Sequence, residues 1–122
     1  MNEQMTKIDN APMDLRDRTL IFSRDVIRFS KSIERSQLNF ELLRQLVRSA
    51  TSVGANFIEA KDSASKKDFR NKVLISKKEA SETLYWLRLC EESSLNPELA
   101  RLEQECKEII LILQKIIDTL KH

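Results

Sequence analysis

The chain has 122 residues, a length that suits a single domain with its own apolar core. It contains one glycine and one histidine, at position 122. One glycine excludes the repeated tight turns of an all-β fold and any glycine-rich phosphate loop. One histidine excludes a Ser-His-Asp triad, a His-rich metal site and a di-iron bundle site. The composition therefore predicts helices, with no catalytic residues, metal or cofactor.

The net charge of +2 conceals an uneven distribution. Residues 16–88 hold 16 basic and 9 acidic side chains, whereas residues 89–122 hold 4 basic and 7 acidic ones. A basic middle and an acidic end permit a polyanionic partner without requiring one.

No apolar run approaches the roughly 18 residues of a membrane span, and residues 1–12 lack the apolar stretch of a signal peptide. We therefore expect a cytoplasmic protein that has reduced thiols and uses neither a membrane nor a small-molecule substrate. Cys90 and Cys106 lie at or near core-facing positions of their helices, so we expect both to be buried and structural.

Residues 1–13 are expected to form a flexible N-terminal arm, and residues 14–122 a single domain. The first helix is predicted over about 15–33, capped by Asp14, and the second over about 40–60, capped by Asn39. Their apolar stripes repeat at helical spacing. The two stripes are Leu15, Phe22, Val26, Phe29 and Ile33, then Leu43, Leu46, Val47, Ala50, Val53, Gly54 and Phe57.

The third helix is predicted to begin after Ser65, which with Asp68 resembles a capping box, and to end near Ser94. Asn96-Pro97-Glu98 is a start signal for the fourth helix. Their core stripes are Phe69, Val73, Ser76, Ala80, Leu84 and Leu87, then Leu99, Leu102, Cys106, Ile110, Leu113, Ile117 and Leu120.

Four amphipathic helices with short connections must run antiparallel to their neighbours. The predicted fold is all-α, an antiparallel up-down-up-down four-helix bundle. A glycine inside a helix costs about 1 kcal/mol relative to alanine. Gly54, on the core stripe, therefore predicts that the backbone of a neighbouring helix comes close.

The third helix carries a second apolar cluster away from its core stripe, formed by Leu74, Ile75, Tyr85, Trp86 and Leu89. We interpret it as a subunit interface, because interfaces favour aromatic residues. Two alternatives remain open: the cluster lies under the N-terminal arm, or it widens the intramolecular core.

The second helix has a non-core face of small or specifically polar residues. Arg48 and Glu59 share that face but lie three turns apart, so each needs a partner on another helix. The face is either an ordinary solvated surface or a close-packed contact with a neighbouring subunit. The candidate oligomer interface comprises Arg48, Ser49, Ser52, Asn56, Glu59, Leu74, Lys78, Glu82, Tyr85, Trp86 and Leu89.

Two basic stripes could follow a phosphate backbone, although a run of charge can also be a solvated face. The first occupies one face of the first helix, and the second lies on a flank of the third. The candidate nucleic-acid-binding residues are Arg24, Arg28, Lys31, Arg35, Lys66, Lys67, Arg70 and Lys77.

Residues 45–87 carry a series of short elements in a fixed order. They are Arg48-Ser49, Ser52-Val53-Gly54-Ala55-Asn56, Glu59-Ala60, Lys67-Asp68-Phe69, Lys72, Lys78-Glu79-Ala80, Glu82-Thr83 and Tyr85-Trp86-Leu87. This series resembles the signature of the bacterial four helix bundle protein family, whose members are often encoded in intervening sequences of large-subunit ribosomal RNA genes. Phe57 departs from the signature, which commonly has a smaller aliphatic residue there.

The resemblance implies a four-helix bundle that assembles as a ring, commonly a homopentamer. It also implies kinship with the accessory variability protein of diversity-generating retroelements, which binds nucleic acid and a reverse transcriptase through a basic surface. The sequence thus predicts a non-catalytic oligomer that binds RNA or DNA, as an accessory to a retroelement or an rRNA intervening sequence. The alternative is a protein-interaction scaffold that binds no nucleic acid.

Overall fold

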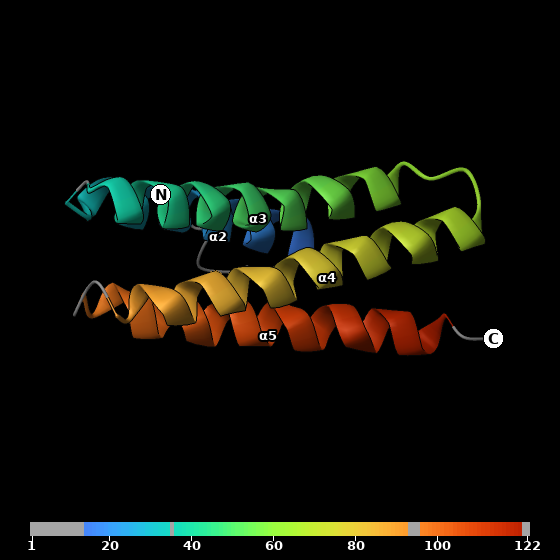
Figure 1. Cartoon of the computed structure of the whole chain (residues 1–122). Coiled ribbons are helices and arrows are strands. Elements are labelled where there is room, and N and C mark those ends of the chain that lie inside the picture. Colours follow the sequence, from blue (N-terminus) through green and yellow to red (C-terminus); the bar gives the residue numbers. More distant parts are fainter. Residues whose placement is uncertain (1–13, 35, 93–95, 121–122) are drawn as a thin grey trace, which may run out of the picture.

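A computed structural model describes residues 14–34, 36–92 and 96–120, and four long helices account for most of them. The helices are α2 (Leu15–Ser32), α3 (Gln37–Lys61), α4 (Lys66–Cys90) and α5 (Glu98–Thr119) (Figure 1). The α2–α3 and α4–α5 connections lie at one end of the molecule, and the α3–α4 turn lies at the other. Each helix therefore runs antiparallel to its neighbours in the chain, and the predicted up-down-up-down bundle is confirmed.

Around the bundle, α2 packs against α3, α3 against α4, α4 against α5, and α5 against α2. This order places α2 and α4 on opposite corners. With 18 residues, α2 is about 27 Å long at 1.5 Å per residue, whereas the 25 residues of α3 span about 37 Å. The shorter helix does not reach the end that carries the α3–α4 turn (Figure 1). The predicted arm, residues 1–13, lies outside the described residues.

Three of the predicted helix starts are confirmed by hydrogen bonds. The carboxylate of Asp14 accepts a hydrogen bond from the backbone N–H of Arg16 at 2.9 Å. The hydroxyl of Ser65 accepts one from the backbone N–H of Asp68 at 3.0 Å. Asn96 accepts from the N–H of Glu98 at 2.8 Å. Such bonds satisfy donors that have no partner within the helix.

The predicted start of α3 was wrong by three residues. The hydroxyl of Ser36 caps this helix and accepts from the N–H of Asn39 at 3.1 Å. The amide of Asn39 instead donates to the carbonyl of Glu34. Leu38, predicted to lie in the connector, is therefore helical. The C-terminal end of α4 also differs from the prediction. This helix ends at Cys90, earlier than the predicted end near residue 94.

The core follows the predicted stripes in outline, but several stripe residues are only partly buried, namely Ile33, Val47, Phe69 and Leu120. Two further positions change places with a neighbour. On α5 the fully buried residue is Ile109, while Ile110 is only partly buried. On α4, Thr83 is buried and Leu84 lies at the edge of the core. Both cysteines are buried thiols, as predicted, and neither forms a disulfide within the described residues. Burial raises the pKa of Cys90 to about 11 and that of Cys106 to about 12, so both are neutral thiols near pH 7.

Two hydroxyl groups, one partly buried and one fully buried, join neighbouring helices. Ser23 on α2 donates to the carbonyl of Ala50 at 3.3 Å, and Ser76 on α4 donates to the carbonyl of Val53 at 2.7 Å. Side chains this small let the helix backbones approach, and the bond from the fully buried Ser76 satisfies a polar group that water cannot reach.

Gly54 marks the close approach that its position predicted, but a side chain makes the nearest contact. A methyl group at Gly54 would lie 3.0 Å from Oγ1 and 3.2 Å from Cβ of Thr19 on α2, and 3.8 Å from its backbone carbonyl carbon. Thr19 is itself fully buried, with its hydroxyl bound to the carbonyl of Arg16.

Candidate oligomer and nucleic-acid interfaces

Arg48 and Glu59, each predicted to need a partner on another helix, both find one on α4. Arg48 forms ion pairs with Glu82 and, at 3.5 Å, with Glu79. Glu59 pairs with Lys72 at 2.7 Å. These pairs cross the α3–α4 seam of the same chain, so neither residue requires a neighbouring subunit to satisfy its charge.

Small polar residues on the same face of α3 mostly bind backbone groups of α3. Ser52 donates to the carbonyl of Arg48 and Asn56 to that of Ser52, both at 2.8 Å. Ser49 is fully buried and accepts a hydrogen bond from Thr83 on α4 at 2.9 Å. Ser49 therefore serves the α3–α4 contact and is no part of the exposed surface.

The outer face of α4 carries the predicted apolar surface. Leu74, Ile75 and Leu89 are 37%, 39% and 37% exposed, and Tyr85 is 59% exposed. Lys78 is also exposed on this helix. A row of large apolar side chains along one helix is more than the scattered apolar exposure of an ordinary surface.

Trp86 lies differently from its neighbours on α4. It is partly buried against the core, so the alternative of a widened core holds for this residue. Its ring meets that of Tyr85 edge to face with centroids 5.2 Å apart, and its indole N–H donates to Glu82 at 3.1 Å. These bonds from Trp86 and Arg48 lower the pKa of the Glu82 carboxyl, which stays ionised and ties α3 to α4.

A hollow of about 490 Å³ opens beside Trp86, between the start of α3 and the end of α4. Its apolar lining comprises Leu38, Leu42, Trp86 and Leu89, and polar side chains of Asn39, Glu41, Gln45 and Glu92 complete it. Sequence reasoning missed Leu38 and Leu42. Their spacing of four residues, continued by Gln45 three residues later, was the available signal for a second helix face.

The basic stripe of α2 is exposed as predicted at Arg24, Arg28 and Lys31. Arg28 forms an ion pair of 3.5 Å with Asp25, which leaves its side chain 76% exposed. Arg35, the fourth predicted member, lies outside the described residues.

The second basic group lies on α4. Lys66 and Lys67 are exposed, whereas Arg70 and Lys77 are partly buried. Because α2 and α4 occupy opposite corners of the bundle, one chain does not join the two groups into a single surface.

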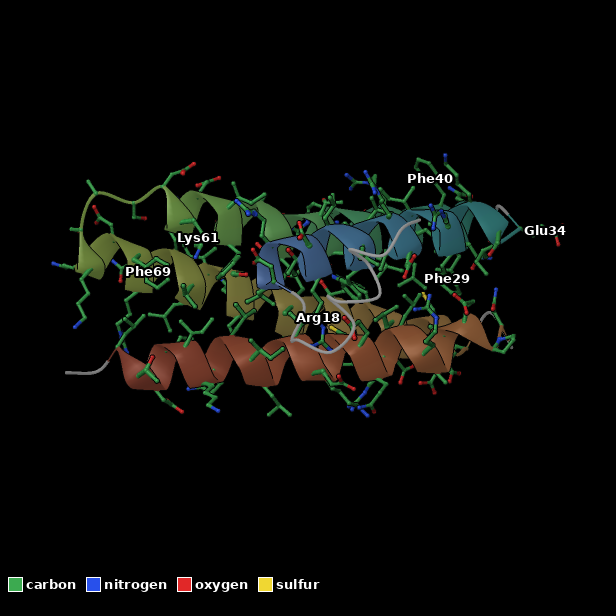
Figure 2. The ribbon with its side chains drawn as sticks, turned by 180° about the vertical axis from the view of Figure 1, so that it is seen from behind. Arg18, Phe29, Glu34, Phe40, Lys61 and Phe69 are labelled. Carbon is green, nitrogen blue, oxygen red and sulfur yellow. The ribbon has the colours of Figure 1, made fainter. Side chains whose placement is uncertain are left out.

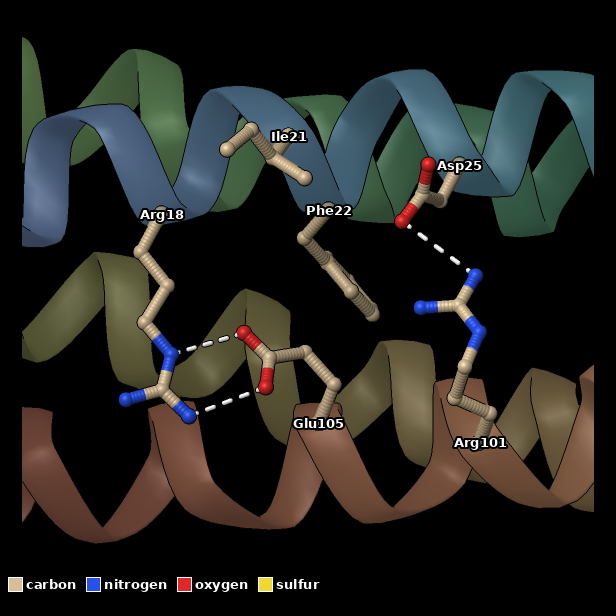
Figure 3. Close-up of a pocket in the computed structure, with 6 residues that line it drawn as sticks. All are labelled: Arg18, Ile21, Phe22, Asp25, Arg101 and Glu105. Carbon is tan, nitrogen blue, oxygen red and sulfur yellow. Dashed lines mark hydrogen bonds and ion pairs between the residues drawn. The ribbon is translucent and has the colours of Figure 1, made fainter. Parts of the chain in front are cut away.

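Two further arginines are held between α2 and α5. Arg18 makes two bonds to Glu105, at 2.7 and 2.9 Å (Figure 3). It makes a third bond, of 2.6 Å, to Glu108. Figure 2 shows its side chain extending from α2 toward α5. Arg101 pairs with Asp25 at 3.2 Å across the same seam. Arg18 and Arg101 line a pocket between α2 and α5. Since carboxylates already bind both guanidinium groups, this pocket is not a free anion site.

None of the described helices is long and apolar enough to cross a membrane. Within the described ranges, no cluster of three or more His, Cys, Asp or Glu side chains could hold a metal ion.

Comparison with known proteins settles the family. The model of the 23S rRNA-intervening sequence protein family matches residues 13–115. The chain belongs to that family. A crystal structure from Bacteroides thetaiotaomicron VPI-5482, described as a protein of unknown function from the S23 ribosomal protein family, is similar to it with 35% identity and a TM-score of 0.78. That similarity covers 85% of this chain and 98% of the other. No curated protein matches the chain.

This membership agrees with the resemblance found in residues 45–87. Much of the series falls on the α3–α4 seam described above, including Arg48, Glu82 and Trp86. The family's sequence elements therefore coincide with the cross-helix contacts that hold α3 and α4 together.

Proposed function

We propose that this member of the 23S rRNA-intervening sequence protein family is a non-catalytic, ring-forming homo-oligomer that binds RNA or DNA through basic helix faces. The observation that carries the proposal is the row of exposed cations Arg24, Arg28 and Lys31 on α2. Their spacings of four and three residues place one cation on each successive helical turn, about 5.4 Å apart. Such a row can follow a phosphate backbone without reading its sequence.

Oligomerisation gives this row its strength in the proposal. Three cations on one helix make a weak field, but symmetry-related copies would combine their rows into a larger one. The exposed apolar face of α4 supplies a surface for such assembly, and the family resemblance favours a homopentamer. The family's description names a 23S rRNA intervening sequence, which supports a role beside such a sequence. The role beside a retroelement rests on the family resemblance alone. In the retroelement case, a reverse transcriptase would be a protein partner.

A binding assay tests the proposal. Fluorescence anisotropy with labelled single-stranded RNA and duplex DNA compares the natural chain with a variant in which Arg24, Arg28, Lys31 and Arg35 are all glutamine. We expect the natural chain to bind at low salt and the variant to bind at least tenfold more weakly. A control variant removes four cations elsewhere by changing Arg44, Lys61, Lys107 and Lys115 to glutamine. Equal losses of affinity in both variants would show that binding depends on net charge alone, and would contradict the proposal that α2 forms the binding surface.

The hollow beside Trp86 favours a second candidate function, a protein-interaction scaffold that binds no nucleic acid. Its apolar lining and polar rim are the features of a protein-docking surface. A protein partner that co-purifies stoichiometrically, in a preparation free of nucleic acid and with no low-salt binding, would favour this function over the first.

A further inference from the structure

Charge divides α4 and its C-cap region into two opposite halves. Residues 66–78 hold six cations and one anion, whereas residues 79–92 hold four anions and one cation. Each half also presents exposed apolar side chains, Leu74 and Ile75 in the basic half and Tyr85 and Leu89 in the acidic half. The two ends of one helix are therefore complementary to each other in charge and alike in apolar character.

The hollow beside Trp86 adjoins the acidic half. Its walls offer apolar surface from Leu38, which is 79% exposed, and from Leu89. Glu92 lies at its rim, next to the exposed Glu91, while the other rim carboxylate, Glu41, already pairs with Arg44 at 2.7 Å. An occupant that matches this surface carries aliphatic side chains followed by a cation.

The basic half of α4 has that chemistry. Leu74 and Ile75 are adjacent, and Lys78 follows Leu74 by one helical turn, so all three lie on the exposed side of the helix. We propose that Leu74 and Ile75 of one copy insert into the hollow of the next copy, where Lys78 meets Glu92. This inference rests on the proposed oligomer and specifies how its subunits join.

The inserting and receiving surfaces are different parts of the chain, so the contact is heterologous. Heterologous contacts join subunits head to tail and close into a ring when the rotation between copies permits. A two-fold packing of α4 against α4 would use the same residues but would stop at a dimer. The size of the natural assembly therefore separates the two arrangements.

Complementation between two defective variants tests the contact. The insertion variant carries Leu74→Asp and Ile75→Asp, and the hollow variant carries Leu38→Asp and Leu89→Asp. A control variant carries Leu20→Asp and Leu111→Asp, two exposed apolar positions on α2 and α5, at 47% and 69%. Circular dichroism is used to test whether each variant is folded, and the single substitutions Ile75→Asp and Leu38→Asp replace any double variant that is not. Light scattering after size-exclusion chromatography gives the masses.

We expect the natural chain and the control to exceed twice the chain mass of 14.2 kDa, and each defective variant to be monomeric. A 1:1 mixture of the two defective variants should form a heterodimer, because it restores one sound contact. A mixture that stays monomeric, or a defective variant that keeps the natural mass, would overturn the inference and leave the proposed oligomer intact. If the natural chain is a dimer, or if the control variant dissociates, the inferred head-to-tail contact is likewise overturned. A natural monomer would overturn both proposals.

Discussion

Gly54 on α3 packs closely against Thr19 on α2, and a methyl group at Gly54 would lie 3.0 Å from the threonine Oγ1, so that Thr19 would have to move. Thr19 is fully buried, and its hydroxyl is bound to the carbonyl of Arg16. The single glycine of the chain is therefore a packing residue, and its place in the helix interior has a physical reason.

Gly54→Ala should destabilise the protein despite the better helix propensity of alanine. The substitution gains about 1 kcal/mol of propensity. Crowding against a buried β-branched residue costs about 1–3 kcal/mol. We expect a net loss of about 1 kcal/mol by urea unfolding. In the Thr19→Ala background, which removes the nearest atom, the loss should shrink by at least about 0.5 kcal/mol. A Gly54→Ala protein more stable than the natural chain would contradict the packing role.

Ser76→Ala should lower the free energy of unfolding by about 1 kcal/mol, because it removes a buried bond and leaves the carbonyl of Val53 without this donor. Ser81→Ala, on an exposed part of the same helix, is the matched control and should change stability by less than about 0.5 kcal/mol. Equal effects of the two substitutions would mean that the bond between α4 and α3 contributes nothing.

Arg18→Met should lower stability by about 1 kcal/mol, because Arg18 bridges Glu105 and Glu108 and its loss leaves two carboxylates together. Gln104 and Arg18 together lower the pKa of Glu108. Because folding lowers this pKa, the two bonds contribute to the stability of the protein above the pKa of the unfolded chain, and that stability is lost as the pH falls and Glu108 takes up a proton. The difference between Arg18→Met and the natural chain should therefore be smaller at pH 3 than at pH 7. A difference that does not depend on pH would instead point to packing of the side-chain stem.

Glu103→Gln should stabilise the protein at pH 7. Burial, with the neighbouring Glu91, raises the pKa of the Glu103 carboxyl, although Lys107 and Arg88 oppose the shift. When the pKa of a carboxyl is higher in the folded than in the unfolded chain, the protein becomes less stable as the pH rises between the two pKa values. The gain from glutamine should therefore appear at pH 7 and vanish near pH 4. Glu105→Gln, which weakens the bond to Arg18, should show the opposite sign at pH 7.

The bundle could be predicted from the sequence because its apolar stripes and its caps at Asp14, Ser65 and Asn96 are local patterns. The start of α3 was missed because Ser36 and Asn39 are both good capping residues, and only the backbone shows which one supplies the oxygen. Periodicity likewise placed Tyr85 on an outer face but could not separate it from Trp86 beside it.

The partners of Arg48 depended on tertiary register. Helical spacing showed that Arg48 needed a carboxylate on another helix, but the alignment of α3 with α4 decides that Glu82 supplies it. The hollow could not be predicted for the same reason. Its lining residues Leu38 and Leu42 on α3 meet Trp86 and Leu89 on α4 only after the two helices pack. Contacts between helices are therefore the part of the candidate site that one-dimensional patterns leave open.

The salt dependence of nucleic-acid binding tests the central claim most directly. The affinity of the natural chain for a labelled RNA or DNA strand should fall linearly on a plot of log affinity against log salt concentration. Each phosphate contact contributes about 0.7 to the slope on a single strand and about 0.9 on a duplex. Removing Arg24, Arg28, Lys31 and Arg35 should reduce the slope by several such steps. The absence of binding by the natural chain at low salt, or an unchanged slope in the variant, would contradict the account.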